Sequence, residues 1–194
     1  MNPLLLPLLL LQAPSPAPWR PVAVSSLGGP AQAQVAQAQA AKGKLAQALM
    51  GRLQAEMKAH GPAAAVEVCR SEAPLLAAEV GRSEGLRIGR TSDRLRNPAN
   101  TGPEWAQPLL ATRPAEATFA LGPKGELGAI LPIRLQASCL ACHGESAKLA
   151  PGVVDALRKA YPKDQATGYH EGDLRGWFWV EVPAKSPSQN PTQH

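Results

Sequence analysis

The chain has few aromatic residues, few cysteines and no long apolar run. Phe, Trp and Tyr make up 4% of its 194 residues, so a core must rest mainly on Ala, Leu and Val. No stretch reaches the roughly 20 consecutive apolar residues that a membrane-spanning helix requires. The net charge is only +5, from 20 Lys and Arg against 15 Asp and Glu, and the basic residues form no long run. This balance does not favour nucleic-acid binding.

The sequence also lacks the motifs of common hydrolases and nucleotide-binding enzymes. Its Ser, His and Asp residues show no nucleophile-elbow pattern, and it has no glycine-rich phosphate loop. It has no internal repeat. A chain of this length suits one domain with some additional sequence.

The N-terminal residues have the pattern of a secretory signal peptide, which we place at residues 1–17. An apolar run covers Leu4–Leu11 with one interruption at Pro7, and small residues follow it. A secretory signal has an apolar region of about 7–15 residues and then a small-residue cleavage site. We therefore expect the protein to be exported, into the periplasm in a bacterium, although no Lys or Arg precedes the run.

The remaining sequence divides by composition into three parts. Residues 18–32 are rich in Pro, Ser and Gly and are predicted to be a disordered linker, since they offer little to bury. Residues 33–183 are predicted to form the folded domain. Residues 184–194 are polar and are predicted to be a disordered tail.

Two helices are predicted at the start of the domain. Residues 33–60 contain no Pro and carry one apolar stripe, formed by Leu45, Leu49, Leu53 and Met57. A second helix is predicted over residues 63–80, with a break near Glu72 because Pro74 interrupts the pattern.

Strands dominate the second half of the domain. Residues 86–91 are a short candidate strand, residues 117–121 and 126–135 are predicted to form a hairpin, and residues 177–182 form a closing strand rich in aromatic and β-branched residues. Residues 104–110 and 153–160 are predicted to be short helices. The expected fold class is α+β, with a small antiparallel sheet flanked by helices and preceded by a long helix.

The clearest chemical signal is the pentapeptide Cys139-Leu140-Ala141-Cys142-His143. This spacing is typical of a c-type haem attachment site. Two sulfurs one helical turn apart can each form a thioether with one arm of a porphyrin, and the adjacent imidazole then lies under the iron. The alternatives are half of a zinc site, which would need further ligands, and a thiol–disulfide pair, which is typical of a βαβ context that the sequence lacks.

A haem iron needs a second axial ligand or keeps an open position. His, Met and thiolate are all known ligands, and the remaining candidates are Cys69, Met50, Met57, His60, His170 and His194. We expect the methionines to pack on the first helix and the histidines to be exposed. Cys69 has apolar neighbours, so it is either a ligand or a small buried hydrophobic residue.

Several ordered motifs within residues 45–182 resemble those of a known family. They are Ala65–Pro74 (AVEVCRSEAP), Ile88–Ser92 (IGRTS), Arg96–Asn100 (RNPAN), Glu104-Trp105, Cys139–Gly144 (CLACHG), Tyr161–Tyr169 (YPKDQATGY) and Gly172–Gly176 (GDLRG). With these motifs the chain resembles single-haem c-type cytochromes of PAS-like fold with Cys/His axial ligation. The resemblance implies His143 and a cysteine as axial ligands, and Cys69 occupies the matching position.

An arginine-rich segment provides candidate partners for the haem propionates. Arginine binds carboxylates through two parallel hydrogen bonds, and Arg90 and Arg96 lie within the matched motifs. The alternative is a solvated basic edge.

Two classes of function remain. The first is an exported single-haem c-type cytochrome, which carries electrons at low potential with a redox partner protein or senses redox state or a gas such as CO or NO. The second is a haem enzyme with peroxidase-like activity, or a dithiol or zinc protein without haem. We expect no enzyme activity, because two protein ligands would block peroxide and cysteines in thioethers cannot cycle.

Overall fold

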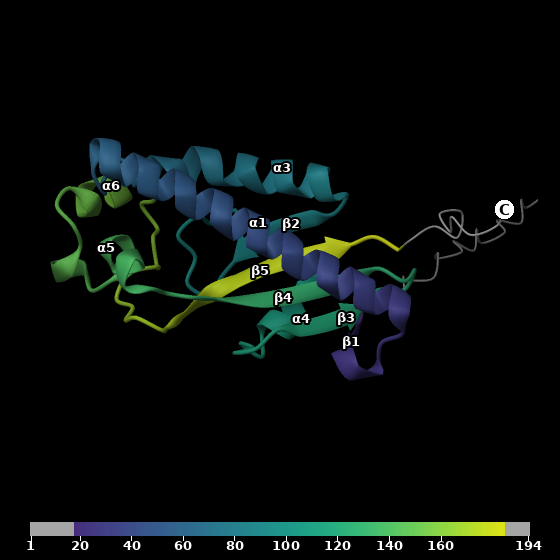
Figure 1. Cartoon of the computed structure of the whole chain (residues 1–194). Helices are drawn as coiled ribbons and strands as arrows, with labels where there is room; N and C mark the ends of the chain where they lie inside the picture. The colour runs from purple at the N-terminus through teal and green to yellow at the C-terminus, as the bar shows by residue number, and fades with distance from the viewer. Residues whose placement is uncertain (1–17, 185–194) are drawn as a thin grey trace, which may run out of the picture.

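Five strands form one antiparallel sheet in the computed structural model, which describes residues 18–184. The strands are β1 (Arg20–Val22), β2 (Arg87–Thr91), β3 (Thr118–Leu121), β4 (Leu127–Arg134) and β5 (Leu174–Val182), in the spatial order β1-β3-β4-β5-β2. β3 and β4 form a hairpin that closes where the Gly122 N–H donates to the Glu126 carbonyl. The sheet's two edges are thus β1 and β2 (Figure 1).

Two helices cover one face of the sheet. α1 (Gly29–His60) crosses it at a slant, and α3 (Ala73–Glu84) lies beside α1 (Figure 1). Ala38, Ala41 and Leu45 of α1 are fully buried in the core that α1 and α3 form with β2, β4 and β5. The small alanine side chains allow the helix backbone to approach the sheet closely, which suits a sequence with few aromatic residues.

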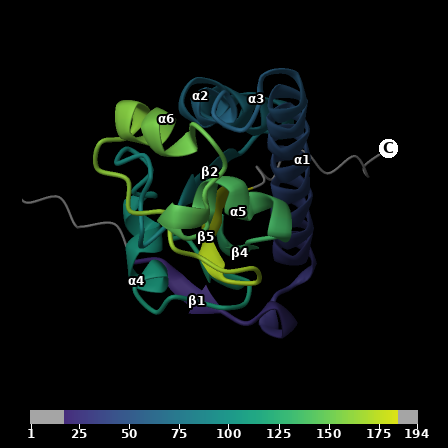
Figure 2. The ribbon, with the colours of Figure 1, turned by 90° about the vertical axis from the view of Figure 1, so that its left-hand side faces the viewer.

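A short helical segment covers the other face. The 3₁₀ turn Glu104–Ala106 continues into α4 (Gln107–Leu110), and Ala106 packs with Ile130 and Trp177 of the sheet. Figure 2 shows α1 and α4 on opposite sides of the strands. Both faces of the central strands are therefore buried.

The remaining helices lie together at one end of the sheet. α5 (Leu140–His143) and α6 (Val153–Ala160) are close to the C-terminal end of α1 and to α2 (Ala65–Glu67) (Figures 1 and 2). Val66 of α2 packs with Val153 and Leu157 of α6. None of the helices within residues 18–184 is long and apolar enough to cross a bilayer.

The predicted α+β class is confirmed, and the arrangement is consistent with a PAS-like fold. The long first helix, the strand over residues 86–91, the hairpin, the helix over residues 153–160 and the closing strand all occur close to their predicted bounds. The break near Glu72 takes the form of a π turn over Val68–Glu72, in which the Ala73 N–H donates to the Val68 carbonyl. Pro74 has no N–H to donate, so the regular hydrogen-bond pattern cannot continue through this position.

The prediction that residues 18–32 form a disordered linker is wrong. β1 pairs with β3 through Val22 and Phe119, a 3₁₀ turn follows at Val24–Ser26, and α1 begins at Gly29. An edge strand tolerates Pro21, and Pro30 in the first turn of a helix loses no hydrogen bond. Composition alone could not predict that residues 18–32 are ordered, because their structure depends on pairing with a strand about 100 residues away. The predicted signal peptide and residues 185–194 of the predicted tail lie outside the described residues.

Candidate functional site

A cavity at the end of the sheet brings the three cysteines and one histidine together. It encloses about 1190 Å³ of empty space, its open mouth included, between α1, the π turn, β2 and α5. Cys69 and Cys139, which are 70 positions apart in the sequence, thus line the same cavity. Its polar or reactive lining residues include Cys69, Cys139, Cys142, His143, Arg90 and Arg175.

The Cys139–His143 motif forms the helical turn that its spacing predicts. A 3₁₀ turn over Ala137–Cys139 leads directly into α5, and the Gln136 N–H lies 3.4 Å from Cys139 Sγ. All three thiols are free, and burial raises the pKa of the Cys142 thiol. Within the described part of the chain, no three His, Cys, Asp or Glu side chains gather as a metal-ion site.

His143 is held with one ring nitrogen committed to the protein. Its Nδ1 lies 2.7 Å from the Ala166 carbonyl oxygen, so Nδ1 carries the proton and donates it. The pKa of the imidazole lies well below its usual value, mainly because of burial and then because of the charges of Arg96 and Arg175. The ring is therefore neutral, with the Nε2 lone pair available, which is the form that binds a metal.

Cys69 lies on the π turn and lines the same cavity. Single π turns inside α-helices occur frequently at functional sites. The turn inserts an extra residue, so it changes the direction in which side chains leave the helix relative to a regular one. Its thiol is partly buried, as an interior ligand position requires.

The two predicted propionate-binding arginines have different surroundings. Arg90 lines the cavity, burial lowers the pKa of its guanidinium, and that guanidinium makes no hydrogen bond or ion pair within residues 18–184. Arg96 instead pairs with Asp164 and donates to the carbonyls of Cys142 and Ala166. Two of its three guanidinium nitrogens are thus committed to protein, although Arg96 also lines the cavity.

Arg175 is a cavity residue that the sequence did not reveal. In the β4–β5 ladder Ile133 pairs with Gly176 and Arg134 pairs with Leu174, so Arg175 is the extra residue of a bulge. Bulges turn a side chain in a new direction and occur next to functional sites. Its guanidinium donates to Ser92 Oγ at 2.7 Å.

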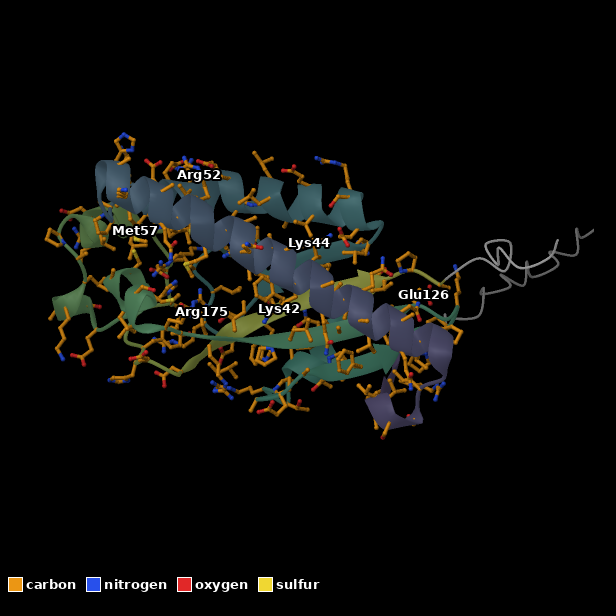
Figure 3. The ribbon with its side chains drawn as sticks, viewed as in Figure 1. Lys42, Lys44, Arg52, Met57, Glu126 and Arg175 are labelled. Atoms are coloured by element: carbon orange, nitrogen blue, oxygen red, sulfur yellow. The ribbon has the colours of Figure 1, made fainter. Side chains whose placement is uncertain are left out.

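The two methionines of the first helix, Met50 and Met57, both line the cavity. Figure 3 shows Met57 on the part of α1 that extends past the sheet. His60 and His170 are exposed, as expected, and pair with acidic side chains. His194 lies outside the described residues.

The residues present fit a covalently attached haem. Apolar walls from Leu49, Leu53, Val66, Ile133 and Leu135 could cover a porphyrin. The two thiols of the pentapeptide, the free Nε2 of His143 and the Cys69 sulfur are the donors that such a group uses. Arg90 supplies an unpaired positive charge of the kind that propionates need.

The comparisons with known proteins identify a family and support the fold. The Tll0287-like family model matches residues 27–183. A solved structure, described as the crystal structure of the cyanobacterial heme-protein Tll0287, is 24% identical in sequence. It aligns with a TM-score of 0.59 over 83% of this chain and 100% of that chain, which supports the fold. The comparison with curated proteins gave no match.

Proposed function

The chain belongs to the Tll0287-like family, and we propose that it is an exported single-haem c-type cytochrome that transfers electrons at low potential. The observation that carries the proposal is the convergence of the Cys139–His143 turn and Cys69 on one cavity. Neither half would suffice alone: the turn of Cys139–His143 would hold the haem and supply one iron ligand, and Cys69 on the π turn would supply the second.

The proposed roles follow from the chemistry of each side chain. Cys139 and Cys142 form the two thioethers, and His143 binds the iron through Nε2. Cys69 would supply a second iron ligand as a thiolate, because metal coordination deprotonates a thiol. Once bound, the haem supplies a single iron that takes up and releases one electron.

The side chains around the iron are expected to lower its reduction potential. The anionic sulfur of Cys69 favours the more positive oxidation state of the iron, so the potential is low compared with that of a Met-ligated cytochrome. Arg90 and Arg175 line the cavity and offset the propionate charges. The apolar side chains of α1 exclude water from the ligands, which limits the rearrangement that accompanies each electron transfer.

The ligand set argues for electron transfer over catalysis. Two protein ligands leave no open position for peroxide, and cysteines in thioethers cannot act as a redox dithiol. Export is part of the proposal because bacteria form these thioethers outside the cytoplasm. A redox partner protein is then required, and binding of CO or NO would require Cys69 to leave the iron.

Absorption and electron paramagnetic resonance spectra test this function. The protein, produced in cells with a haem-ligation system, is expected to show a low-spin ferric spectrum of thiolate type. A high-spin ferric spectrum would favour an open, reactive site. Absence of a Soret band would favour the dithiol or zinc alternatives.

A further inference from the structure

A buried ion pair lies directly behind the histidine of the attachment motif. Arg96 Nε is 3.1 Å from Asp164 Oδ2, and the two side chains are only 8% and 10% exposed. Burying two charges is costly unless further hydrogen bonds satisfy them. The remaining partners of this pair therefore indicate what it does.

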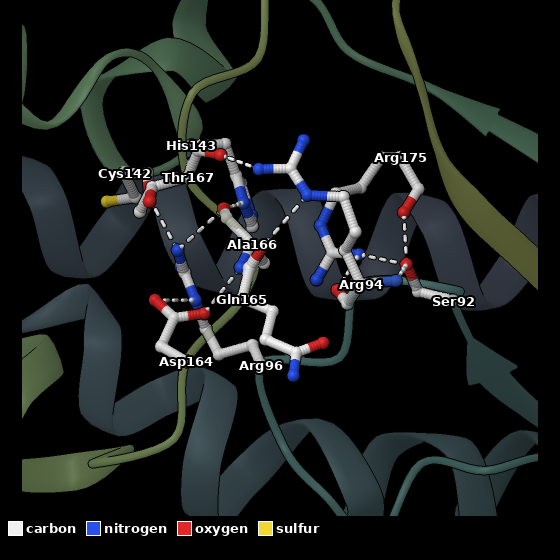
Figure 4. A network of polar contacts seen from close by, with 10 residues as sticks. All are labelled: Ser92, Arg94, Arg96, Cys142, His143, Asp164, Gln165, Ala166, Thr167 and Arg175. Atoms are coloured by element: carbon white, nitrogen blue, oxygen red, sulfur yellow. Dashed lines mark hydrogen bonds and ion pairs between the residues drawn. The ribbon is translucent and has the colours of Figure 1, made fainter.

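Those partners are the peptide groups that hold His143. Arg96 Nη2 donates to the Cys142 carbonyl at 2.6 Å and to the Ala166 carbonyl at 3.1 Å. Asp164 Oδ1 accepts the Ala166 N–H at 2.8 Å. The ion pair thus hydrogen-bonds to both the N–H and the carbonyl of Ala166. That carbonyl is also the acceptor for His143 Nδ1–H (Figure 4).

The same segment is also attached to α5 by its backbone. The Tyr169 N–H donates to the His143 carbonyl, and the Gly168 N–H donates to the Gly144 carbonyl at 2.7 Å. These bonds dock the segment but do not touch Ala166. The orientation of the Ala166 carbonyl depends on Arg96 and Asp164.

We propose that Arg96 and Asp164 are positioning residues that fix the Ala166 carbonyl against His143 and thereby lower the reduction potential. This inference rests on the proposed haem ligation. A hydrogen bond from Nδ1–H orients a ligating imidazole and raises its basicity. A more basic imidazole favours the oxidised iron, so loosening the carbonyl raises the potential.

Arg96→Lys is the most informative variant. Lysine keeps the positive charge but cannot reach three acceptors with a planar group. The charge near the iron is unchanged, so a simple electrostatic effect predicts no shift in potential. Positioning predicts that the reduction potential rises, by an amount that shifts the equilibrium about tenfold toward the reduced form. Tenfold is the low end for loss of a ligand's outer hydrogen-bonding partner. For one electron this is about 59 mV.

Arg94→Lys is the matched control. Arg94 donates to the carbonyls of Gln165 and Thr167, on either side of Ala166, but makes no hydrogen bond to Ala166 itself. The same substitution thus loosens the same segment without touching the acceptor of His143. We expect it to leave the potential near that of the wild type.

The second measurement reads the hydrogen bond directly. In the reduced protein, solvent exchange of the His143 Nδ1 proton is followed by NMR. Exchange is expected to be faster in Arg96→Lys and in the isosteric Asp164→Asn, which serves if Arg96→Lys does not fold. Equal potentials for Arg94→Lys and Arg96→Lys, or unchanged proton exchange in the Arg96 and Asp164 variants, would overturn the proposal. Loss of covalent haem from the wild type would instead defeat the proposed function.

Discussion

The buried pair of Arg96 and Asp164 gives a stability prediction that can be worked from the structure. Asp164→Asn keeps the shape of the side chain and an oxygen for the Ala166 N–H, but it removes the charge that faces Arg96 at 3.1 Å. Removing one partner of a buried pair costs about 3–5 kcal/mol. We expect the low end, about 3 kcal/mol, because Arg96 keeps two carbonyl acceptors.

For a domain of this size, 1 kcal/mol corresponds to about 2–4 °C in the unfolding midpoint. Circular dichroism of the haem-loaded protein is therefore expected to show a midpoint about 6–12 °C lower for Asp164→Asn. Asp155→Asn is the matched control: Asp155 pairs with Arg158 on α6, but the two side chains are 83% and 73% exposed. Exposed pairs contribute little. Equal shifts in the two variants would refute the argument that burial makes the Arg96–Asp164 pair stabilising.

Three further predictions concern other parts of the molecule. Cys69→Ala is expected to lose the thiolate-type absorption spectrum while keeping covalent haem; an unchanged spectrum would exclude Cys69 as a ligand. Leu45→Ala is expected to lower the free energy of unfolding in urea by about 2–5 kcal/mol, because Leu45 is fully buried in the helix–sheet core. A smaller loss would mean that α1 is less tightly packed than described. Gly176→Ala is expected to destabilise the protein by about 1–3 kcal/mol in the same assay, because its φ is 152° and a Cβ would collide with the Thr91 carbonyl; wild-type stability would show that the bulge tolerates a side chain.

Local patterns predicted the elements whose stability is local. The apolar stripe of α1 and the turn residues of the β3–β4 hairpin each stand in one stretch of sequence, so they gave nearly correct bounds. β1 has only three residues and a Pro, and it forms because β3 offers a free edge. No composition rule applied to residues 18–32 detects that pairing.

The site shows the same division. Cys139, Cys142 and His143 lie within five consecutive residues, so their spacing alone predicted the helical turn that they form. The partners of Arg96 lie 46 to 70 positions away, and the direction of Arg175 depends on a bulge between two strands. Such contacts arise only when distant segments meet, which is why the roles of these two arginines emerged from the structure.

Covalent attachment of haem is the central claim, and one measurement tests it most directly. Purified protein is unfolded and extracted with acidified organic solvent, and the polypeptide is weighed by mass spectrometry. We expect the pigment to stay with the polypeptide and the mass to exceed that of the chain by one haem, with both effects lost when Cys139 and Cys142 are replaced by serine. Pigment that passes into the solvent, or a colourless polypeptide of unmodified mass, would contradict the account.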